Sequence, residues 1–444
     1  MAKIQTPLST HFGLVGHTPD SARLGEHVMS LAKKILSLFV KRKTAADEIL
    51  AKIEQQLVFQ KSQAMTIGVE CEFGIVNTDT CDPAHVGHDI ARSLNNPFVH
   101  YELYQHMIEI TTGICTSIQQ VEKDLADRVN MILPHLPQHQ TAMLGIGNLP
   151  LLMLEQVVPV ETERFKMLRE TRQALYERFT TLGMHIHIGM ADTSSCIRFH
   201  NFYMHLLPHL LALSASSPFE FGRDTGFASI RPTVTESVPI AGLPYQFKSW
   251  HDYKDLCRAM ARAGSIGDLK DLWWDLRPCP RYGTLEIRIC DQPPTLAEVA
   301  AIGAFVHCLG HWFNEHQGWL DEMPRPNNWL MRENKWRAMR YGLDANIVIN
   351  GDGDTMPIKT DILQWLERLQ PFYKKFGYRH YQATLVGMLE KGNSASRQRR
   401  VFQATQSLQA VYAHCIEELR HGSPLWDRAE ALEKSRGLSP VKEA

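Results

Sequence analysis

The chain has 444 residues, of which 44% are hydrophobic and 21% are charged, and its formal net charge at pH 7 is -1. This length is enough for two or three domains, or for one large enzyme domain with extensions. The balanced charge excludes a global electrostatic attraction to nucleic acid or to an anionic membrane, so we expect neither as a partner.

The cysteines and the apolar runs bear on the compartment. Nine cysteines are scattered along the chain without a C-x-x-C pair, and Met1 is not followed by a secretory leader. No run of apolar residues reaches membrane-spanning length. We therefore expect free thiols in a soluble, cytoplasmic protein.

Residues 1–64 are expected to form an N-terminal helical extension. Apolar residues recur every three or four positions in two stretches, separated by the basic run Lys41–Lys43: Val28, Leu31, Ile35 and Leu38, then Ile49, Ile53 and Leu57. This spacing predicts two amphipathic helices. They form either a hairpin packed on the main domain or an arm that docks a partner or a second copy in a homo-oligomer.

The main domain is expected over residues 65–422, and its first strand carries two acids. Apolar residues alternate from Ile67 to Ile75 in TIGVECEFGIV, which places Glu70 and Glu72 together on the opposite face. Two adjacent carboxylates repel each other unless a cation lies between them. They are candidate metal ligands, although a strand edge in water would also tolerate them.

Two further acids follow in HYELYQHMIEITT. Glu102 and Glu109 are seven residues apart and would face opposite ways on one straight strand. The strand-forming residues after Met107 favour a turn near Gln105 and His106, which would let both acids reach one site. Ser117 then begins a helix with a capping box to Gln120.

Two segments near the middle of the chain carry polar candidates. LGMHIHIGM predicts a strand with His185 and His187 on one face, where an imidazole pair suits a metal or phosphate site or has a structural role. SASSPFEFGRDTGFASIRP predicts a loop whose Arg223, Asp224 and Arg231 bind a small polar substrate or form surface ion pairs.

The segment WWDLRPCPRYGTLEIRICD, residues 273–291, contains several candidate site residues close together in sequence. Arg277 lies in a proline-bounded loop, and alternation places Glu286 and Arg288 on one face of a strand, opposite Leu285 and Ile287. A carboxylate beside a guanidinium can hold a metal and a phosphate together. The alternative is an edge strand with solvated charges.

Taken together, the acids predict divalent cations, and oxygen ligands with an imidazole suit Mg²⁺ or Mn²⁺ better than zinc. Arginines beside such a metal imply a phosphate. The chain has no G-x-x-x-x-G-K-[ST] motif, so a nucleotide must be held by metal and arginine. The rest of the chain after Thr295 is expected to be mainly helical, with a mobile tail over 423–444.

Six motifs in order resemble the carboxylate-amine ligases of the glutamate-cysteine ligase type 2 family: GVECEF, ELYQHMIEITT, GMHIHIG, ALSASSPFEFGRDTGFASIR, WWDLRPCPRYGTLEIRICD and ENKWRAMRYGLDA. The resemblance implies an α+β fold like the glutamine synthetase catalytic domain, in which a curved antiparallel sheet flanked by helices forms a funnel for metal and ATP. It also implies an ATP-dependent ligase that forms an amide through an acyl phosphate, with small-molecule carboxylate and amine substrates.

The resemblance also assigns roles to residues. It implies one metal held by Glu70, His185 and Glu286, and a second held by Glu72, Glu102 and Glu109. Arg277 would contact ATP phosphate together with His187, and Arg288 would stabilise the transferring phosphoryl group, with Glu286 completing the catalytic set. Two other classes remain open: a metal- and nucleotide-binding scaffold without turnover, and a phosphotransferase without an amine acceptor.

Overall fold

The centre of the protein is a seven-stranded antiparallel sheet. In this computed structural model, which describes residues 27–31, 33–34, 46–322 and 328–435, the strands lie in the order β10-β11-β5-β1-β3-β2, with β4 paired to the far end of β1. Their bounds are β1 Ile67–Asn77, β2 Val99–Tyr101, β3 Met107–Thr111, β4 Thr141–Leu144, β5 Gly183–Gly189, β10 Leu276–Cys279 and β11 Thr284–Asp291. Each of the predicted strands is present.

The apolar face of the sheet forms the main core. Along β1 the side chains of Val69, Cys71, Phe73 and Ile75 are all buried, and they share one hydrophobic cluster with Ile186 and Ile287 of the neighbouring strands. Alternation thus turns the aliphatic residues of β1, β5 and β11 to one side and their acids, histidines and arginines to the other. The prediction that Cys71 points away from the acidic face is confirmed.

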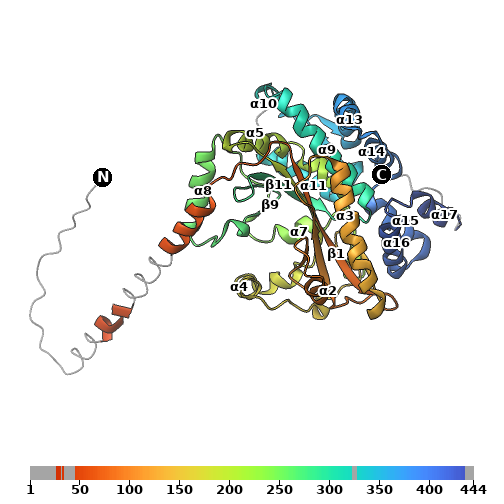
Figure 1. Ribbon diagram of the computed structural model, residues 1–444, viewed down its shortest axis with the longest axis horizontal. Coiled ribbons are helices and arrows are strands. Elements are labelled where there is room, and N and C mark those ends of the chain that lie inside the picture. Colours follow the sequence, from red (N-terminus) through yellow and green to blue (C-terminus); the bar gives the residue numbers. More distant parts are fainter. Residues whose placement is uncertain (1–26, 32, 35–45, 323–327, 436–444) are drawn as a thin grey trace, which may run out of the picture.

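Helices cover this apolar face and leave the polar face open. The helices that contact strands of the sheet include α3 Ile118–Ile132, α5 Thr193–Met204, α6 Leu207–Ser214 and α9 Leu296–Glu315. The expectation that no apolar run reaches membrane-spanning length is corrected: helix α9 is long and apolar enough to span a membrane, but 89% of its most apolar window is buried inside the protein. It is the central core helix, and α3 and α14 (Arg379–Lys391) pack against it (Figure 1).

The remaining helices surround this centre, and the last of them gather at the C-terminal side of the molecule (Figure 1). Their bounds are α2 Gly87–Leu94, α4 Glu163–Arg172, α7 Arg231–Thr235, α8 Trp250–Arg262, α10 Trp319–Glu322, α11 Asn328–Tyr341, α12 Ile358–Arg368, α13 Gln370–Phe376, α15 Ser394–Thr405, α16 Leu408–His421 and α17 Trp426–Ser435. Three short strand pairs complete the structure: β6 Phe219–Glu220 with β7 Arg223–Asp224, β8 Ala241–Gly242 with β9 Trp273–Trp274, and β12 Asn346–Val348 with β13 Thr355–Pro357.

The sequence predicts a capping box at Ser117 with Gln120 and another at Thr295 with Glu298. Both hydroxyls cap their helices, but neither pair forms the reciprocal box. Ser117 accepts from the backbone N–H of Gln120, whereas the Gln120 side chain accepts from Thr116 rather than from Ser117. Thr295 caps α9 in the same way, and the Glu298 side chain turns to the Thr295 hydroxyl and to Arg397. The sequence therefore predicted the two N-cap residues correctly, but it did not predict the hydrogen-bond partners of the Gln120 and Glu298 side chains.

The second helix of the predicted extension belongs to the main body. Residues 46–56 are helical, and Ile53 and Leu57 are buried in a hydrophobic cluster together with α8 residues. Glu54 binds Arg258 of α8, beside which this helix lies in Figure 1. Of the two alternatives for this segment, packing on the main domain holds here, and most of the first helix lies outside the described residues.

Two further expectations are corrected. The segment after Ser423 is not simply a mobile tail, because α17 packs on α15 and the Trp426 indole donates to the carbonyl of Gly392. Arg277 does not lie in a loop, because residues 276–279 form β10 and pair with β11. The two prolines around Cys279 are compatible with an edge strand, which needs hydrogen bonds on one side only.

Candidate active site

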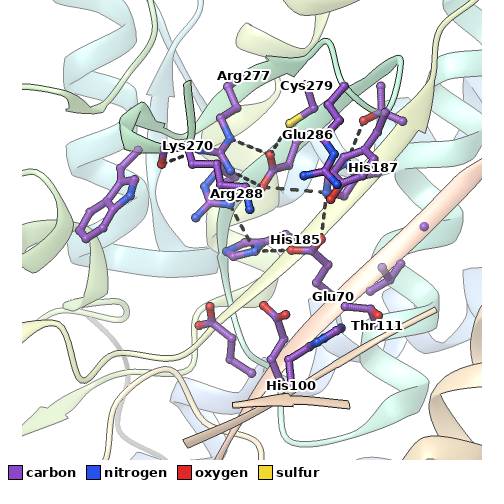
Figure 2. A pocket seen from close by; sticks show the side chains of 18 of the residues that line it. Glu70, His100, Thr111, His185, His187, Lys270, Arg277, Cys279, Glu286 and Arg288 are labelled. Atoms are coloured by element: carbon purple, nitrogen blue, oxygen red, sulfur yellow. Dashed lines mark hydrogen bonds and ion pairs between the residues drawn. The ribbon is translucent and has the colours of Figure 1, made fainter. Parts of the chain in front are cut away.

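The strand register places the predicted acids, histidines and arginines next to each other across the polar face. Opposite one another in neighbouring strands are Arg277 and Glu286, Glu286 and His187, Glu70 and His185, and Glu72 and Glu109. Directly opposed residues in an antiparallel pair have their Cβ atoms about 4.5–5.5 Å apart. Side chains from distant parts of the sequence therefore form one continuous polar surface (Figure 2).

The turn predicted between Glu102 and Glu109 is confirmed. β2 pairs with β3 so that His100 lies opposite Glu109, and Glu102 follows β2 directly. Both acids line the same pocket as Glu70 and Glu72. A hairpin brings together two carboxylates that a straight strand would have pointed apart.

The polar face lines a cavity of about 1170 Å³. Its walls also include aromatic and basic side chains from outside the sheet, among them Phe165, Phe179, Trp273 and Lys270. Sites for a single drug-sized ligand have volumes of about 300–1,000 Å³. This cavity is therefore large enough for a nucleotide and small substrates together.

Glu286 is the most constrained acid of the pocket, with a side chain only 2% exposed. The Nε and Nη2 atoms of Arg277 donate to its two oxygens at 2.7 and 3.3 Å, and Arg288 binds the Oε1 atom from the same strand. Burial alone would raise the pKa of Glu286, but the two guanidinium groups outweigh it and hold this pKa well below its usual range. The arginines thus favour the ionised form of Glu286.

The two arginines differ in how many donors they have already used. Arg277 also donates to the carbonyl oxygens of Leu272 and Lys270 at 2.7 and 3.3 Å. Among the described residues, Arg288 uses only its Nη1 atom, toward Glu286 and, at 3.5 Å, toward His185. Arg277 thus anchors Glu286 from a fixed position, and Arg288 keeps donors directed to the pocket.

The histidines surround Glu70. His185 Nδ1 lies 3.1 Å and His187 Nε2 lies 3.2 Å from the Glu70 carboxylate. Burial alone would raise the pKa of Glu70, but the two histidines outweigh it and lower this pKa. Burial, assisted by Arg288, lowers the pKa of His185, so that this imidazole is neutral and can act as a metal ligand.

Glu102 and Glu109 have the opposite electrostatic environment. Burial, with the charge of Glu72 next, raises the pKa of Glu102 to about 8. Burial and the charge of Glu102 raise the pKa of Glu109 well above its usual range. Carboxylates that share a site in this way require protons or a cation between them.

A divalent cation fits these donors. The structure places ligand atoms of Glu70, His185 and Glu286 within 4.8 Å of one another, and likewise those of Glu72, Glu109 and His185. The Nε2 atom of His185 is buried without a hydrogen-bond partner, which is costly unless a ligand is bound there. Most donors are carboxylate oxygens, the ligands that Mg²⁺ and Mn²⁺ prefer.

The predicted substrate loop only partly reaches the pocket. Arg231 lines it, but its Nη1 atom donates to the carbonyls of Arg288 and Ile289, at the register shift of β11. Arg223 is exposed, Asp224 pairs with Arg399 of α15, and neither lines the cavity. The geometry therefore brings one of these three residues to the site and leaves two on the surface.

Comparison with known proteins decides the family. The sequence of residues 66–414 matches the family model described as glutamate-cysteine ligase family 2. The chain belongs to this family. Its relatives include two proteins named putative glutamate–cysteine ligase 2: one from Bdellovibrio bacteriovorus is 36% identical over 359 residues, and one from Thermobifida fusca is 34% identical over 376 residues. These alignments cover 80% and 82% of this chain and 95% and 94% of the relatives.

Solved structures share the fold of this family member. A glutamate–cysteine ligase from Francisella tularensis in complex with AMP superimposes with a TM-score of 0.61 at 13% identity, covering 87% of this chain and 97% of that one. A bifunctional glutathione synthetase from Pasteurella multocida gives a TM-score of 0.57 at 15% identity, covering 82% of this chain and 52% of that one. The predicted α+β fold with a curved antiparallel sheet is confirmed.

Sequence reasoning missed several residues of the site. The Cys279 thiol donates to Glu286 at 2.7 Å, and the Gly183 amide donates to Glu72. Thr284, which alternation places on the polar face with Glu286, bonds His187 Nδ1 through its hydroxyl at 2.9 Å. Gln56 and Ser62, from the segment before the first strand, also line the cavity. Reading RPCPRYGTLE as a hairpin would have placed Cys279 beside Glu286, whereas no local signal marks Gln56 or Ser62.

Proposed function

We propose that the chain is an ATP-dependent carboxylate–amine ligase that forms an amide through an acyl phosphate, with glutamate and cysteine as the first substrate pair to test. The observation that carries the proposal is the row of groups from Arg277 through Glu286 and His185 to Glu109 on one sheet face inside one large cavity. Membership in the glutamate-cysteine ligase family 2 and the AMP bound to the Francisella tularensis ligase support it.

The proposed chemistry follows from the weakness of a carboxylate as an acyl donor. A substrate carboxylate oxygen attacks the γ-phosphorus of ATP, the bond to the bridging oxygen breaks, and ADP leaves. The amine then attacks the acyl carbon, phosphate leaves with its oxygen, and the nitrogen loses a proton. Both steps move negative charge on phosphate oxygens, which fixed positive groups stabilise.

We assign roles to the residues of the pocket on this basis. Glu70, His185 and Glu286 would hold one Mg²⁺ or Mn²⁺, and Glu72, Glu102 and Glu109 would hold another. Such cations supply charge neutralisation on the phosphate oxygens. Arg288 has donors free for the transferring group. Arg277 and His187 both lie against Glu286 and would contact the nucleotide phosphates.

ADP release measured across pairs of carboxylate and amine compounds tests the proposal. A ligase releases ADP and phosphate in equal amounts only when both substrates are present, and a new amide appears by mass spectrometry. Phosphorylation of the carboxylate without an amine requirement would instead identify a phosphotransferase. ATP and metal binding without turnover on any pair would identify a scaffold.

A further inference from the structure

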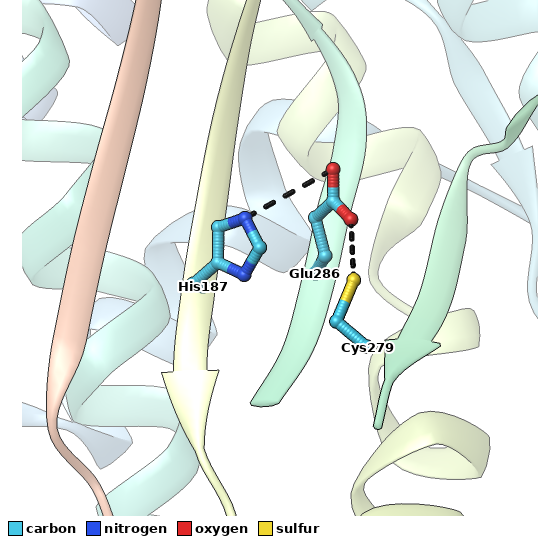
Figure 3. Close-up of side chains that lie close together, drawn as sticks. All are labelled: His187, Cys279 and Glu286. Carbon is cyan, nitrogen blue, oxygen red and sulfur yellow. Dashed lines mark hydrogen bonds and ion pairs between the residues drawn. The ribbon is translucent and has the colours of Figure 1, made fainter. Parts of the chain in front are cut away.

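Beside the acids, the pocket contains a group of mixed donors formed by His187, Cys279 and Glu286. One nitrogen, one sulfur and one oxygen of these residues lie within 4.8 Å of one another (Figure 3). They come from β5, β10 and β11, so three adjacent strands of the sheet fix their backbone positions. The carboxylate clusters described above do not include the thiol.

The thiol stands out among the cysteines of the chain, all of which lie within the described residues. Eight are buried, and Cys279 alone is half-buried and lines the cavity. Its Sγ donates to Glu286 Oε2 at 2.7 Å. A free thiol on the wall of a polar cavity is accessible to ions that enter it.

His187 supplies the second donor. Its Nδ1 atom is engaged with the Thr284 hydroxyl at 2.9 Å, which fixes the ring orientation. Its Nε2 atom lies 4.0 Å from Glu286 Oε1 and 3.2 Å from Glu70, but it is buried without an aligned hydrogen-bond partner. A histidine whose other nitrogen is held by an oxygen is the usual arrangement of a metal-binding imidazole.

The donor set and its dimensions indicate the metal. Thiolate and imidazole ligands select zinc over magnesium. Tetrahedral Zn²⁺ with Zn–S of about 2.3 Å and Zn–N and Zn–O of about 2.0–2.2 Å keeps its ligand atoms roughly 3.4–3.6 Å apart. The separations of Sγ from Oε2, 2.7 Å, and of Nε2 from Oε1, 4.0 Å, lie on either side of this value and involve the two different carboxylate oxygens. Because one nitrogen, one sulfur and one oxygen already lie within 4.8 Å of one another, shifts of about 1–1.5 Å in their separations would bring them to the zinc-binding distances.

We propose that His187, Cys279 and Glu286 form a Zn²⁺ site at the edge of the active-site cavity. Zinc takes the place of the thiol proton: the S–H bond breaks, the proton leaves to solvent, and a sulfur–zinc bond forms. The thiolate and the carboxylate together supply two negative charges to the ion, and the carboxylate is then shared with Arg277 and Arg288. Three protein ligands leave the fourth position open to the cavity.

The site has a consequence for activity that rests on the proposed function. Glu286 belongs both to this zinc site and to the candidate Mg²⁺ site with Glu70 and His185. One carboxylate tightly bound to zinc is drawn away from the second ion and from both arginines. Zinc is therefore an inhibitor of the ligase reaction whose effect depends on Cys279.

Cobalt spectroscopy tests the site without reference to turnover. Co²⁺ is titrated into the full-length protein after treatment with chelator, in excess Mg²⁺, and the near-ultraviolet thiolate-to-cobalt absorption is followed. We expect one equivalent to produce this band, stoichiometric Zn²⁺ to remove it, and Cys279→Ser to lack it. Cys81→Ser, a buried cysteine outside the cavity, is the matched control and keeps the band. A wild-type protein without the band, or a Cys279→Ser protein with it, overturns the proposal.

Two measurements extend the test. Zinc affinity from competition with a chromophoric chelator should fall at least about tenfold in Cys279→Ser, a loss that even an outer-shell partner can cause. If that variant does not fold, alkylation of the wild type read by mass spectrometry decides, because Zn²⁺ must protect Cys279, and an unchanged rate overturns the site. Equal inhibition of wild type and Cys279→Ser by zinc overturns the regulatory consequence. A protein with the cobalt band but no ADP release would refute the proposed function and leave the zinc site standing.

Discussion

Replacing Arg288 by lysine tests the assignment of the phosphoryl-binding group. The Nη1 atom of the Arg288 guanidinium contacts Glu286 and His185, and its other N–H donors are available to a ligand in the cavity. Lysine has one nitrogen on a flexible stem, so it cannot hold Glu286 and span two phosphate oxygens in the same fixed geometry. The loss of one preorganised donor in a transition state costs about 2.7–4 kcal/mol, or about 10²- to 10³-fold in kcat.

The assay is amine-dependent ADP release at saturating ATP, with ATP affinity and thermal unfolding measured on the same preparations. We expect Arg288→Lys to fold and to bind ATP, with kcat and kcat/KM falling together, because the lost interaction forms mainly in the transition state. Arg198→Lys, on α5 and outside the cavity, is the matched control and should behave like the wild type. An unchanged kcat with a raised KM would show that Arg288 only anchors substrate. Failure to fold would make its pair with Glu286 structural.

Three further predictions concern pH, truncation and stability. The Glu102 pKa of about 8 in the folded state exceeds its ordinary value of 4.5, so ionisation of this carboxyl opposes folding. The free energy of unfolding of the metal-free wild type should therefore fall, relative to that of Glu102→Gln, between about pH 4.5 and about pH 8. Urea unfolding that gives parallel pH curves for the two proteins would contradict this. Deleting residues 1–63 should lower the free energy of unfolding by about 3–6 kcal/mol more than deleting residues 1–45, from Ile53 and Leu57 alone, at about 1.5–3 kcal/mol for each buried side chain. Equal stability of the two truncated proteins would refute the packing argument. Arg397→Met removes the guanidinium that pairs with the buried carboxylates of Glu298 and Glu418, so it should lower the free energy of unfolding by about 3–5 kcal/mol in denaturant titrations. A change below about 1 kcal/mol would show that these two acids take up protons instead.

The sequence by itself determined the composition of the sheet and its two faces. Alternation in strands has a period of two residues, so the separation of Glu70 and Glu72 from Val69 and Cys71 follows from local geometry alone and is confirmed. The same reasoning placed His185 with His187 and Glu286 with Arg288. Six ordered motifs also identified the family that the comparison later established.

Only the tertiary structure decided which strands are neighbours and which side chains share a partner. No local sequence pattern predicts that Glu286 lies opposite His187 of a strand far away in sequence. Likewise, no local pattern predicts that Arg277 lies on a strand and that most of its N–H donors already have partners. The loop with Arg223 and Asp224 had the right composition for substrate binding, yet α15 holds Asp224 through Arg399 at the surface. The helix at 46–56 and the thiol of Cys279 likewise acquired their positions from packing and strand pairing. The physical reason is that periodicity fixes the direction of a side chain relative to its own backbone, whereas long-range contacts fix what it meets there.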